Sequence, residues 1–336
     1  MKTIEERKKR WCDFYAGAIR TIIHMDINYN MNVTVSPSTD TMDKFLTRTV
    51  NRYHKLMDQI EWLDDDKIPY VSAIAPMGTA TFAHAFGSPV AYPENTSPFA
   101  LPVIFSAVEL AKIKKPQLEN STLMKMIEYG YKLRKEVPGA LMKLPDIQSP
   151  LDIAAMIWDK TDFFMALYEE PNAVKDLVGM TTSLLTEFLE LWFKTFGNEF
   201  IAHYPDYYMP FGVTLSEDEI GSISTEHFTE FSMPELIYLS EHFGGRIGIH
   251  CCANAKHQWG LLKTIPGLVM LNLVQPDDVL REASSFFRDG PCQMFSSDKV
   301  YDFGAKVVLY GNNPTKSEAL STLAELRKYS EEFKMI

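Results

Sequence analysis

Short apolar runs alternate with helix-like segments along almost the whole chain, and this alternation restricts the possible folds. Several runs are apolar at nearly every position, which is typical of strands buried on both faces of a parallel sheet. Apolar residues at three- and four-residue spacing lie between them, as in amphipathic helices. Eight runs are predicted to be strands: 21–27, 68–75, 140–144, 211–219, 246–252, 268–274, 292–297 and 305–310.

Eight strands with helical connections predict an α/β fold, a TIM (β/α)8 barrel, which holds one core across about 250 residues or more. The 336 residues therefore fit a single domain. Residues 1–66 would supply the N-terminal helices and the first strand, and residues 67–336 the rest of the barrel. A helix predicted over residues 4–16 would form an N-terminal extension.

The charge balance excludes some classes of partner. Lysine and arginine number 33 against 44 acidic residues, giving a net charge of −11, which argues against nucleic-acid binding. Residues 1–10 are charged and no apolar signal segment follows them, and every apolar run is too short to span a membrane. Four cysteines, two of them adjacent, do not form a disulfide framework. We expect a cytoplasmic protein.

The predicted fifth strand ends in a possible metal-binding pair. Active sites of TIM barrels lie at the carboxyl ends of the strands. His250 and Cys252 are two residues apart, so they share one face of the strand. Imidazole and thiolate are both good zinc ligands. The pair predicts a metal site, although isolated histidines and cysteines are more often simply packed in the core.

A zinc site here needs a further ligand. Glu217 and Asp218 end the fourth strand, Asp298 follows the seventh and Asn312 follows the eighth, so all four are placed at the correct end. Glu217 and Asp218 are also the predicted general acid and base, with a solvated acidic loop as the alternative. Cys292 opens the seventh strand, ~15 Å from its carboxyl end, and is interpreted as a core residue.

Other polar residues at strand ends are weaker predictions. Gln148, together with Asp146, follows the third strand and is predicted to orient a bound cofactor or ligand, as is Asn312. His24 and Asp26 lie on one face of the first strand and form either a catalytic pair or a hydrogen-bonded structural pair.

Three segments resemble the uroporphyrinogen decarboxylase superfamily. They are Gly-Ser-Ile-Ser-Thr-Glu-His-Phe at 221–228 with Phe231 and Pro234, Pro-Asp-Ile-Gln-Ser-Pro-Leu-Asp-Ile-Ala at 145–154, and Leu-Tyr-Glu-Glu-Pro-Asn-Ala-Val at 167–174. The likeness extends from about residue 68 to the end of the chain. It implies a TIM barrel independently of the strand pattern.

Two departures separate the chain from true uroporphyrinogen decarboxylases. Those enzymes carry an arginine-rich arm after the first strand and an aspartate at the end of the second. Residues 25–32 contain no arginine, and residues 73–76 read Ala-Ile-Ala-Pro. A substrate with eight carboxylates would be poorly held without basic partners on a chain of charge −11. We therefore do not expect porphyrinogen decarboxylation.

The chain is more similar to the branch that resembles methylcobalamin:coenzyme M methyltransferase. That branch holds zinc with a His-x-Cys pair on the fifth strand and a cysteine near the eighth. His250 and Cys252 match the pair, but Asn312 stands where the third ligand, a thiol, is expected. Asn312, Glu217 or another oxygen would have to complete the site, or the metal is weak or absent.

The resemblance implies a zinc-dependent methyltransferase. It would move a methyl group between a corrinoid (cobalamin), free or on a partner protein, and a small-molecule acceptor or donor. One alternative is a decarboxylase of a smaller carboxylated substrate. The other is a non-catalytic module that binds a corrinoid or tetrapyrrole.

Overall fold

The computed structural model describes residues 1–27, 42–73, 77–94, 96–288, 290, 293–296 and 305–332. All eight predicted strands have a counterpart among them, most with ends shifted by one to three residues. The strands are β1 (Thr21–Ile27), β2 (Tyr70–Ser72), β5 (Leu141–Lys143), β8 (Val213–Ser216), β9 (Ile247–Cys251), β10 (Leu268–Leu273), β11 (Gln293–Ser296) and β12 (Lys306–Asn313).

Short antiparallel pairs, which the sequence pattern does not predict, add to these strands. The pair β3 (Val90–Ala91) and β4 (Phe99–Ala100) forms a small hairpin. The pair β6 (Phe200–Ile201) and β7 (Tyr208–Met209) flanks a turn just before β8. The predicted strand over 211–219 is thus shorter, and the chain before it folds back on itself.

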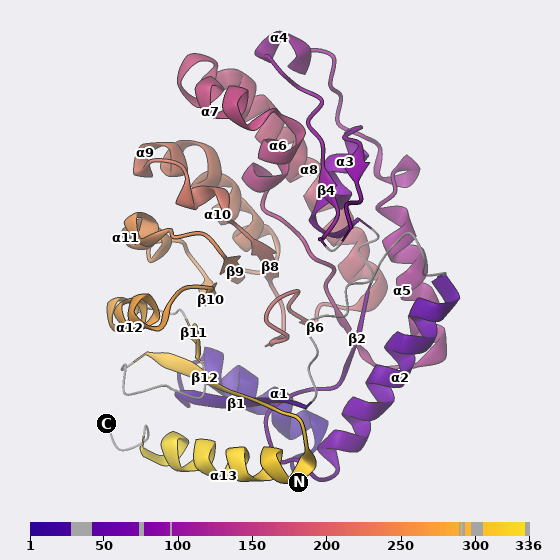
Figure 1. Ribbon diagram of the computed structural model, residues 1–336, viewed down its shortest axis with the longest axis vertical. Coiled ribbons are helices and arrows are strands. Elements are labelled where there is room, and N and C mark those ends of the chain that lie inside the picture. The colour runs from indigo at the N-terminus through magenta and orange to yellow at the C-terminus, as the bar shows by residue number, and fades with distance from the viewer. Residues whose placement is uncertain are drawn as a thin grey trace.

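The eight strands pair in parallel within separate sheets. The sheet orders are β1-β12-β11, β10-β9-β8 and β2-β5-β6-β7. Backbone hydrogen bonds continue between them: Ser149 N–H donates to Ser216 O at 2.7 Å, and Asp66 N–H to Ile23 O at 2.7 Å. The sequence predicts a closed barrel, but among the described residues the strand pairing does not join these sheets into one closed barrel. The strands nevertheless surround a common centre (Figure 1).

Helices lie outside this ring of strands (Figure 1). Local signals explain where two of them begin. The Ser149 side chain caps α6 by accepting from Asp152 N–H at 3.0 Å, and prolines occupy the first turns of α6 and α8. The outer helices are α2 (Met42–Ile60), α5 (Met124–Glu136), α6 (Pro150–Ile157), α8 (Pro171–Phe196), α10 (Met233–His242), α11 (Trp259–Leu262), α12 (Asp277–Phe286) and α13 (Lys316–Glu332).

Four more helices lie between these outer helices along the chain. They are α3 (Thr81–Ala85), α4 (Ala107–Leu110), α7 (Lys160–Glu169) and α9 (Thr225–His227). No helix in the described ranges has the length and apolar character needed to cross a bilayer.

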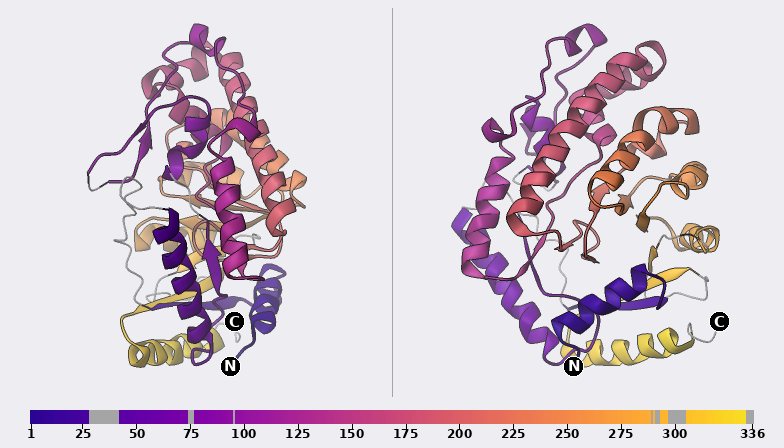
Figure 2. Two further views of the ribbon diagram at one scale, coloured as in Figure 1. Left: turned by 90° about the vertical axis from the view of Figure 1, so that its right-hand side faces the viewer. Right: turned by 180° about the vertical axis from the view of Figure 1, so that it is seen from behind.

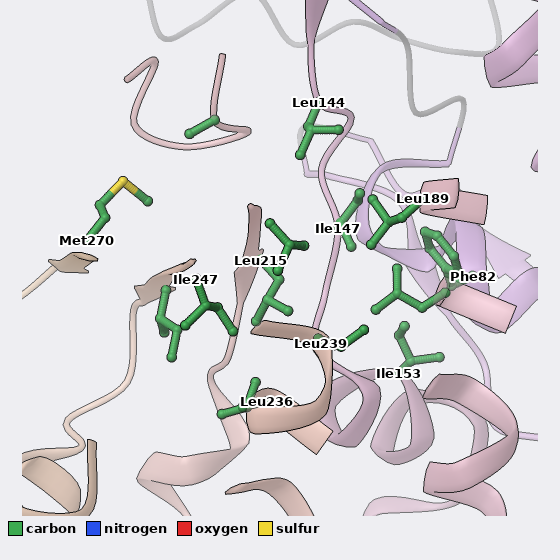
Figure 3. Close-up of a cluster of buried hydrophobic side chains, with 14 of the residues drawn as sticks. Phe82, Leu144, Ile147, Ile153, Leu189, Leu215, Leu236, Leu239, Ile247 and Met270 are labelled. Atoms are coloured by element: carbon green, nitrogen blue, oxygen red, sulfur yellow. The ribbon is translucent and has the colours of Figure 1, made fainter. Parts of the chain in front are cut away.

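The apolar core fills the space between strands and outer helices. Leu215 on β8 and Ile247 on β9 lie beside Leu239 of α10 (Figure 3). Ile153 of α6 and Leu189 of α8 extend the same fully buried cluster. This packing explains why the strands read as continuous apolar runs: one face contacts the helices and the other points to the centre.

Helix α1 (Ile4–Tyr15) precedes β1 and crosses one end of the ring, in front of the strands in the right-hand view of Figure 2. Thr3 and Glu6 form a capping box at its start. Trp11 and Tyr15 are buried, and the Tyr15 hydroxyl donates to Tyr208 O at 2.8 Å. The helix is therefore tied to the turn that precedes β8.

Candidate functional site

His250 and Cys252 face each other at the carboxyl end of β9. His250 Nε2 and Cys252 Sγ are 3.2 Å apart, and Nδ1 lies 2.6 Å from the side-chain oxygen of Asn272. Asn272 sits opposite His250 in the β9–β10 register and is buried. Because an amide oxygen only accepts, Nδ1 carries the ring proton and Nε2 keeps a lone pair directed at the thiol.

His250 is nearly buried, whereas Cys252 is exposed. Burial, together with the carboxylates of Asp218 and Asp146, raises the pKa of Cys252. The aromatic ring of Tyr204 packs edge-on against His250 with ring centroids 4.6 Å apart. The pair thus consists of a fixed imidazole beside an accessible thiol.

A second buried histidine lies beside this pair. His203 is 6.2 Å from His250 between ring centroids, and its Nε2 is 2.9 Å from the hydroxyl of Ser216. Burial and the neighbouring His250 and Lys143 hold the pKa of His203 well below its usual range. His203 is therefore neutral and acts as a hydrogen-bonding group of the interior.

The two carboxylates predicted to be catalytic, Glu217 and Asp218, lie in different surroundings. Asp218 Oδ1 accepts the backbone N–H of Cys252 at 2.6 Å, so Asp218 belongs to the immediate surroundings of the pair. Glu217 is completely buried, and the Ser232 hydroxyl donates to its Oε2 at 2.8 Å. Burial raises the pKa of Glu217 to about 7. Its side chain lies in the packed layer of Ser232 and Asp152 instead of at the open end of the strands.

Gln148 lies on the same side as the His250–Cys252 pair, and Asn312 on a different sheet. The Gln148 side-chain amide donates to Asp146 Oδ1 at 3.1 Å, and Gln148 forms a parallel bridge with Ser216. Asp146 is exposed, but the surrounding protein raises its pKa. Asn312 is exposed on β12, opposite Asp26 in the register.

Three donors suitable for a metal ion do not come together anywhere in the described ranges. Neither Glu217 nor Asp218 completes a three-ligand group with His250 and Cys252. Asp298, another predicted ligand, and Cys292 lie outside the described residues. The described part of the chain thus offers two adjacent donors, one imidazole and one thiol.

An ionic cluster around Asp206, whose side chain is largely buried, was not predicted. Asp206, in the turn between β6 and β7, accepts hydrogen bonds from Lys143 and from the Tyr70 hydroxyl, and Arg52 is 3.7 Å away. These cations, with Lys67, hold the pKa of Asp206 well below its usual range despite burial. The sequence carried no signal for this cluster, because Asp206 lies in an irregular turn.

His24 and Asp26 belong to the adjoining part of the interior. Asp26 is paired with Lys67 and accepts from the Tyr310 hydroxyl at 2.9 Å. His24 Nε2 is 3.3 Å from the backbone oxygen of Asp206. These contacts bind His24 and Asp26 to different partners, so they do not decide between the two sequence interpretations.

Asn272 was missed as a site residue, and Asp152 was missed as a buried carboxylate. Asn272 was detectable in principle, since it is the single polar residue inside the apolar run 268–274. The pairing of Asn272 with His250 could not be predicted, because the sequence of one strand does not determine its register with the neighbouring strand. Asp152 looks like an ordinary first-turn acid of a helix.

Comparisons with known proteins agree with the resemblance of the three sequence segments. The model of the uroporphyrinogen decarboxylase (URO-D) family matches residues 50–317. Among solved structures, a methyltransferase from Methanosarcina mazei is similar with a TM-score of 0.66, at 11% identity, over 98% of this chain and 99% of that chain. No curated protein matches the chain. At such low identity the structural likeness concerns the fold. The fold and the family together imply a TIM barrel, and the extent of the family match shows that this chain belongs to the uroporphyrinogen decarboxylase (URO-D) family.

Proposed function

We propose that this protein is a zinc-dependent methyltransferase of the URO-D family. It moves a methyl group between a corrinoid, free or carried by a partner protein, and a small-molecule acceptor or donor. The observation that carries the proposal is the His250–Cys252 pair, with Nε2 and Sγ 3.2 Å apart at a strand end. The fold likeness to a methyltransferase along nearly the whole chain supports it.

The two donors fit a zinc ion. Zinc binds histidine nitrogen at about 2.0–2.1 Å and cysteine sulfur at about 2.3 Å, so two tetrahedral ligands lie roughly 3.5 Å apart. The observed separation is close to this value. Asn272 fixes the ring tautomer that leaves Nε2 free to coordinate, which is the usual outer contact of a metal-binding histidine. The described residues would supply two ligands, and the remaining positions would be taken by a further oxygen donor and the substrate.

Zinc bound here would lower the pKa of a substrate thiol, so that the thiolate could accept a methyl group at neutral pH. The residues of the chain perform the other tasks. Asp218 holds the main chain of Cys252, and Asn272 holds the His250 ring. Asp146, which is exposed and hydrogen-bonded to Gln148, would take up the proton that the acceptor releases. Tyr204 packs edge-on against the imidazole and helps to hold it in place.

Methyl transfer itself can be measured with methylcobalamin and a panel of small thiols, following loss of the methylcobalamin spectrum and formation of the thioether. We expect the Cys252→Ser variant to lower the rate by about 100-fold or more, because a ligand is removed. Cys12→Ser, which alters a half-buried thiol on α1, is the matched control and should keep the wild-type rate. A Cys252→Ser variant as active as wild type would refute the role assigned to the pair.

Family membership also favours a second candidate, decarboxylation of a small carboxylated substrate. A porphyrinogen is disfavoured as the substrate, because Lys67 and Lys143 are already paired with Asp26 and Asp206. Release of CO₂ from a small carboxylated compound without any corrinoid would establish this alternative. Corrinoid binding without transfer to any acceptor would indicate a non-catalytic module instead.

A further inference from the structure

A buried carboxylate on α6, Asp152, has no place in the chemistry described above. Asp152 is 4% exposed, and its two oxygens accept backbone N–H groups of the loop that follows β8. Asp218 N–H donates to Oδ2 at 2.8 Å and Glu219 N–H to Oδ1 at 2.9 Å. Burial and the neighbouring Glu217 raise the pKa of Asp152, and both of its oxygens are nevertheless occupied as acceptors of backbone N–H groups.

The same loop contacts the end of β9 at three points. Glu217 N–H donates to His250 O at 2.9 Å, which continues the β8–β9 pairing. Asp218 Oδ1 accepts Cys252 N–H at 2.6 Å. Gly221 approaches Ala253 so closely that a Cβ atom on residue 221 would lie 2.5 Å from the Ala253 Cβ. The loop is therefore packed directly on the segment that carries Cys252.

These contacts form one chain from α6 to the thiol-bearing residue. Asp152 fixes the backbone of Asp218, and the side chain of Asp218 fixes the backbone of Cys252. Cys252 lies just beyond the last residue of β9, so strand pairing alone does not set its conformation. The backbone oxygen of Cys252 also accepts a hydrogen bond from the side-chain amide of Gln275 at 3.0 Å. This second contact is exposed to solvent.

We propose that Asp152 is a positioning residue for Cys252, acting through Asp218. Asp152 touches neither substrate nor metal. It holds the loop after β8 in the conformation from which Asp218 directs Cys252 toward His250. The relevance to catalysis rests on the function proposed above, in which Cys252 binds zinc.

The first test uses metal-free protein and does not depend on any activity. Amide hydrogen exchange is measured at residues 218, 219 and 252 in wild type and in Asp152→Asn, which keeps the side-chain size and replaces one of the two acceptor oxygens with an NH₂ donor. We expect about tenfold or faster exchange at all three amides, with the amides of β10 unchanged. Glu169→Gln, an exposed carboxylate on α7, is the matched control and should change none of them.

The variant Asp218→Asn tests the second contact of this chain, the hydrogen bond from Cys252 N–H to the Asp218 carboxylate. It should speed exchange at Cys252 and leave Glu219 N–H protected, because the Asp152 carboxylate is still present. If Asp152→Asn fails to fold, Asp152→Ser, which also removes the carboxylate, takes its place in the same exchange measurement. Unchanged exchange at Cys252 in a folded Asp152→Asn, or in Asp218→Asn, would overturn the proposal.

The second test measures metal binding with Co²⁺, a spectroscopic substitute for zinc whose bond to a thiolate gives a charge-transfer absorption. We expect Asp152→Asn to weaken Co²⁺ binding about 10- to 100-fold, the range found when residues behind a metal ligand are changed. Absence of a thiolate band in wild type would overturn the proposed function, while the exchange data would still decide whether Asp152 positions Cys252. Equal Co²⁺ affinity in wild type and Asp152→Asn would overturn the inference alone.

Discussion

The buried residue His24 shows how strongly its surroundings control the charge of a single side chain. Burial and the nearby Lys67 lower its pKa to about 4. Its Nδ1 is buried with no hydrogen-bond partner among the described residues, so a second ring proton would be unsatisfied there. His24 is therefore neutral in the folded protein at neutral pH.

This pKa predicts an acid-dependent loss of stability. Between the ordinary value of 6.5 and about 4, unfolded His24 binds a proton that folded His24 does not, so stability falls as pH decreases. From pH 7 to pH 5 the loss is about 2 kcal/mol. The variant His24→Gln keeps a hydrogen-bond donor toward Asp206 O but has no titrating ring. Its free energy of unfolding should therefore fall by about 2 kcal/mol less than that of wild type between pH 7 and pH 5. Urea unfolding of both proteins at the two pH values checks it; identical losses would contradict the lowered pKa.

For single residues, the spacing within one strand predicted which side chains share a face, whereas contacts between different strands could not be predicted from the sequence. The pair His250 and Cys252 was predicted because residues two apart share a face. Glu217 and Asp218 lie just beyond the end of β8, where strand alternation no longer sets side-chain direction, so the sequence did not say which carboxylate lies near Cys252. The hydrogen bond from Cys252 N–H to Asp218 answers that question.

Helix α1 contains a side chain, Arg7, whose role cannot be predicted from the neighbouring residues in the sequence. The helix was predicted over residues 4–16, close to the observed Ile4–Tyr15. Arg7 lies in a run of charged residues and looks exposed, yet it is fully buried and paired with Asp65. Its guanidinium also donates to Lys67 O at 3.0 Å and Leu63 O at 2.7 Å.

Removing Arg7 should detach α1 from the segment before β2. We expect Arg7→Ala to reduce the free energy of unfolding by about 3–5 kcal/mol, because it leaves Asp65 buried without its partner. Lys9→Ala is the control, since Lys9 is exposed and its ion pair with Asp13 is worth at most about 1 kcal/mol. Denaturant unfolding measures both. Similar losses in the two variants would show that the Arg7 contacts contribute little.

The elements that the sequence did not predict have a common physical reason. The turn between β6 and β7 contains aromatic and proline residues without a helical or alternating pattern. Its conformation depends on distant contacts, such as Asp206 with Lys143 and Tyr15 with Tyr208. Local sequence signals do not encode such partners, whereas apolar runs of the eight strands follow directly from burial.

For the whole molecule, each of the eight predicted strands has a counterpart among the described residues, with four shorter strands besides, and the family match confirms the resemblance of residues 145–154, 167–174 and 221–228. Closure of the sheet is not seen in the described strand pairing. The metal site remains a prediction, because its third ligand depends on residues far apart in the chain. The low identity to the similar methyltransferase structure leaves the acceptor to experiment.

The account depends most on whether His250 and Cys252 form a zinc centre. The measurement that tests this most directly is the zinc content of the protein purified without chelator, determined for wild type and Cys252→Ser. The account predicts about one zinc ion per wild-type chain and little or none in the variant, because a catalytic zinc site loses affinity when a protein ligand is removed. Zinc-free wild-type protein that cannot be loaded with zinc, or equal zinc content in both proteins, would contradict it.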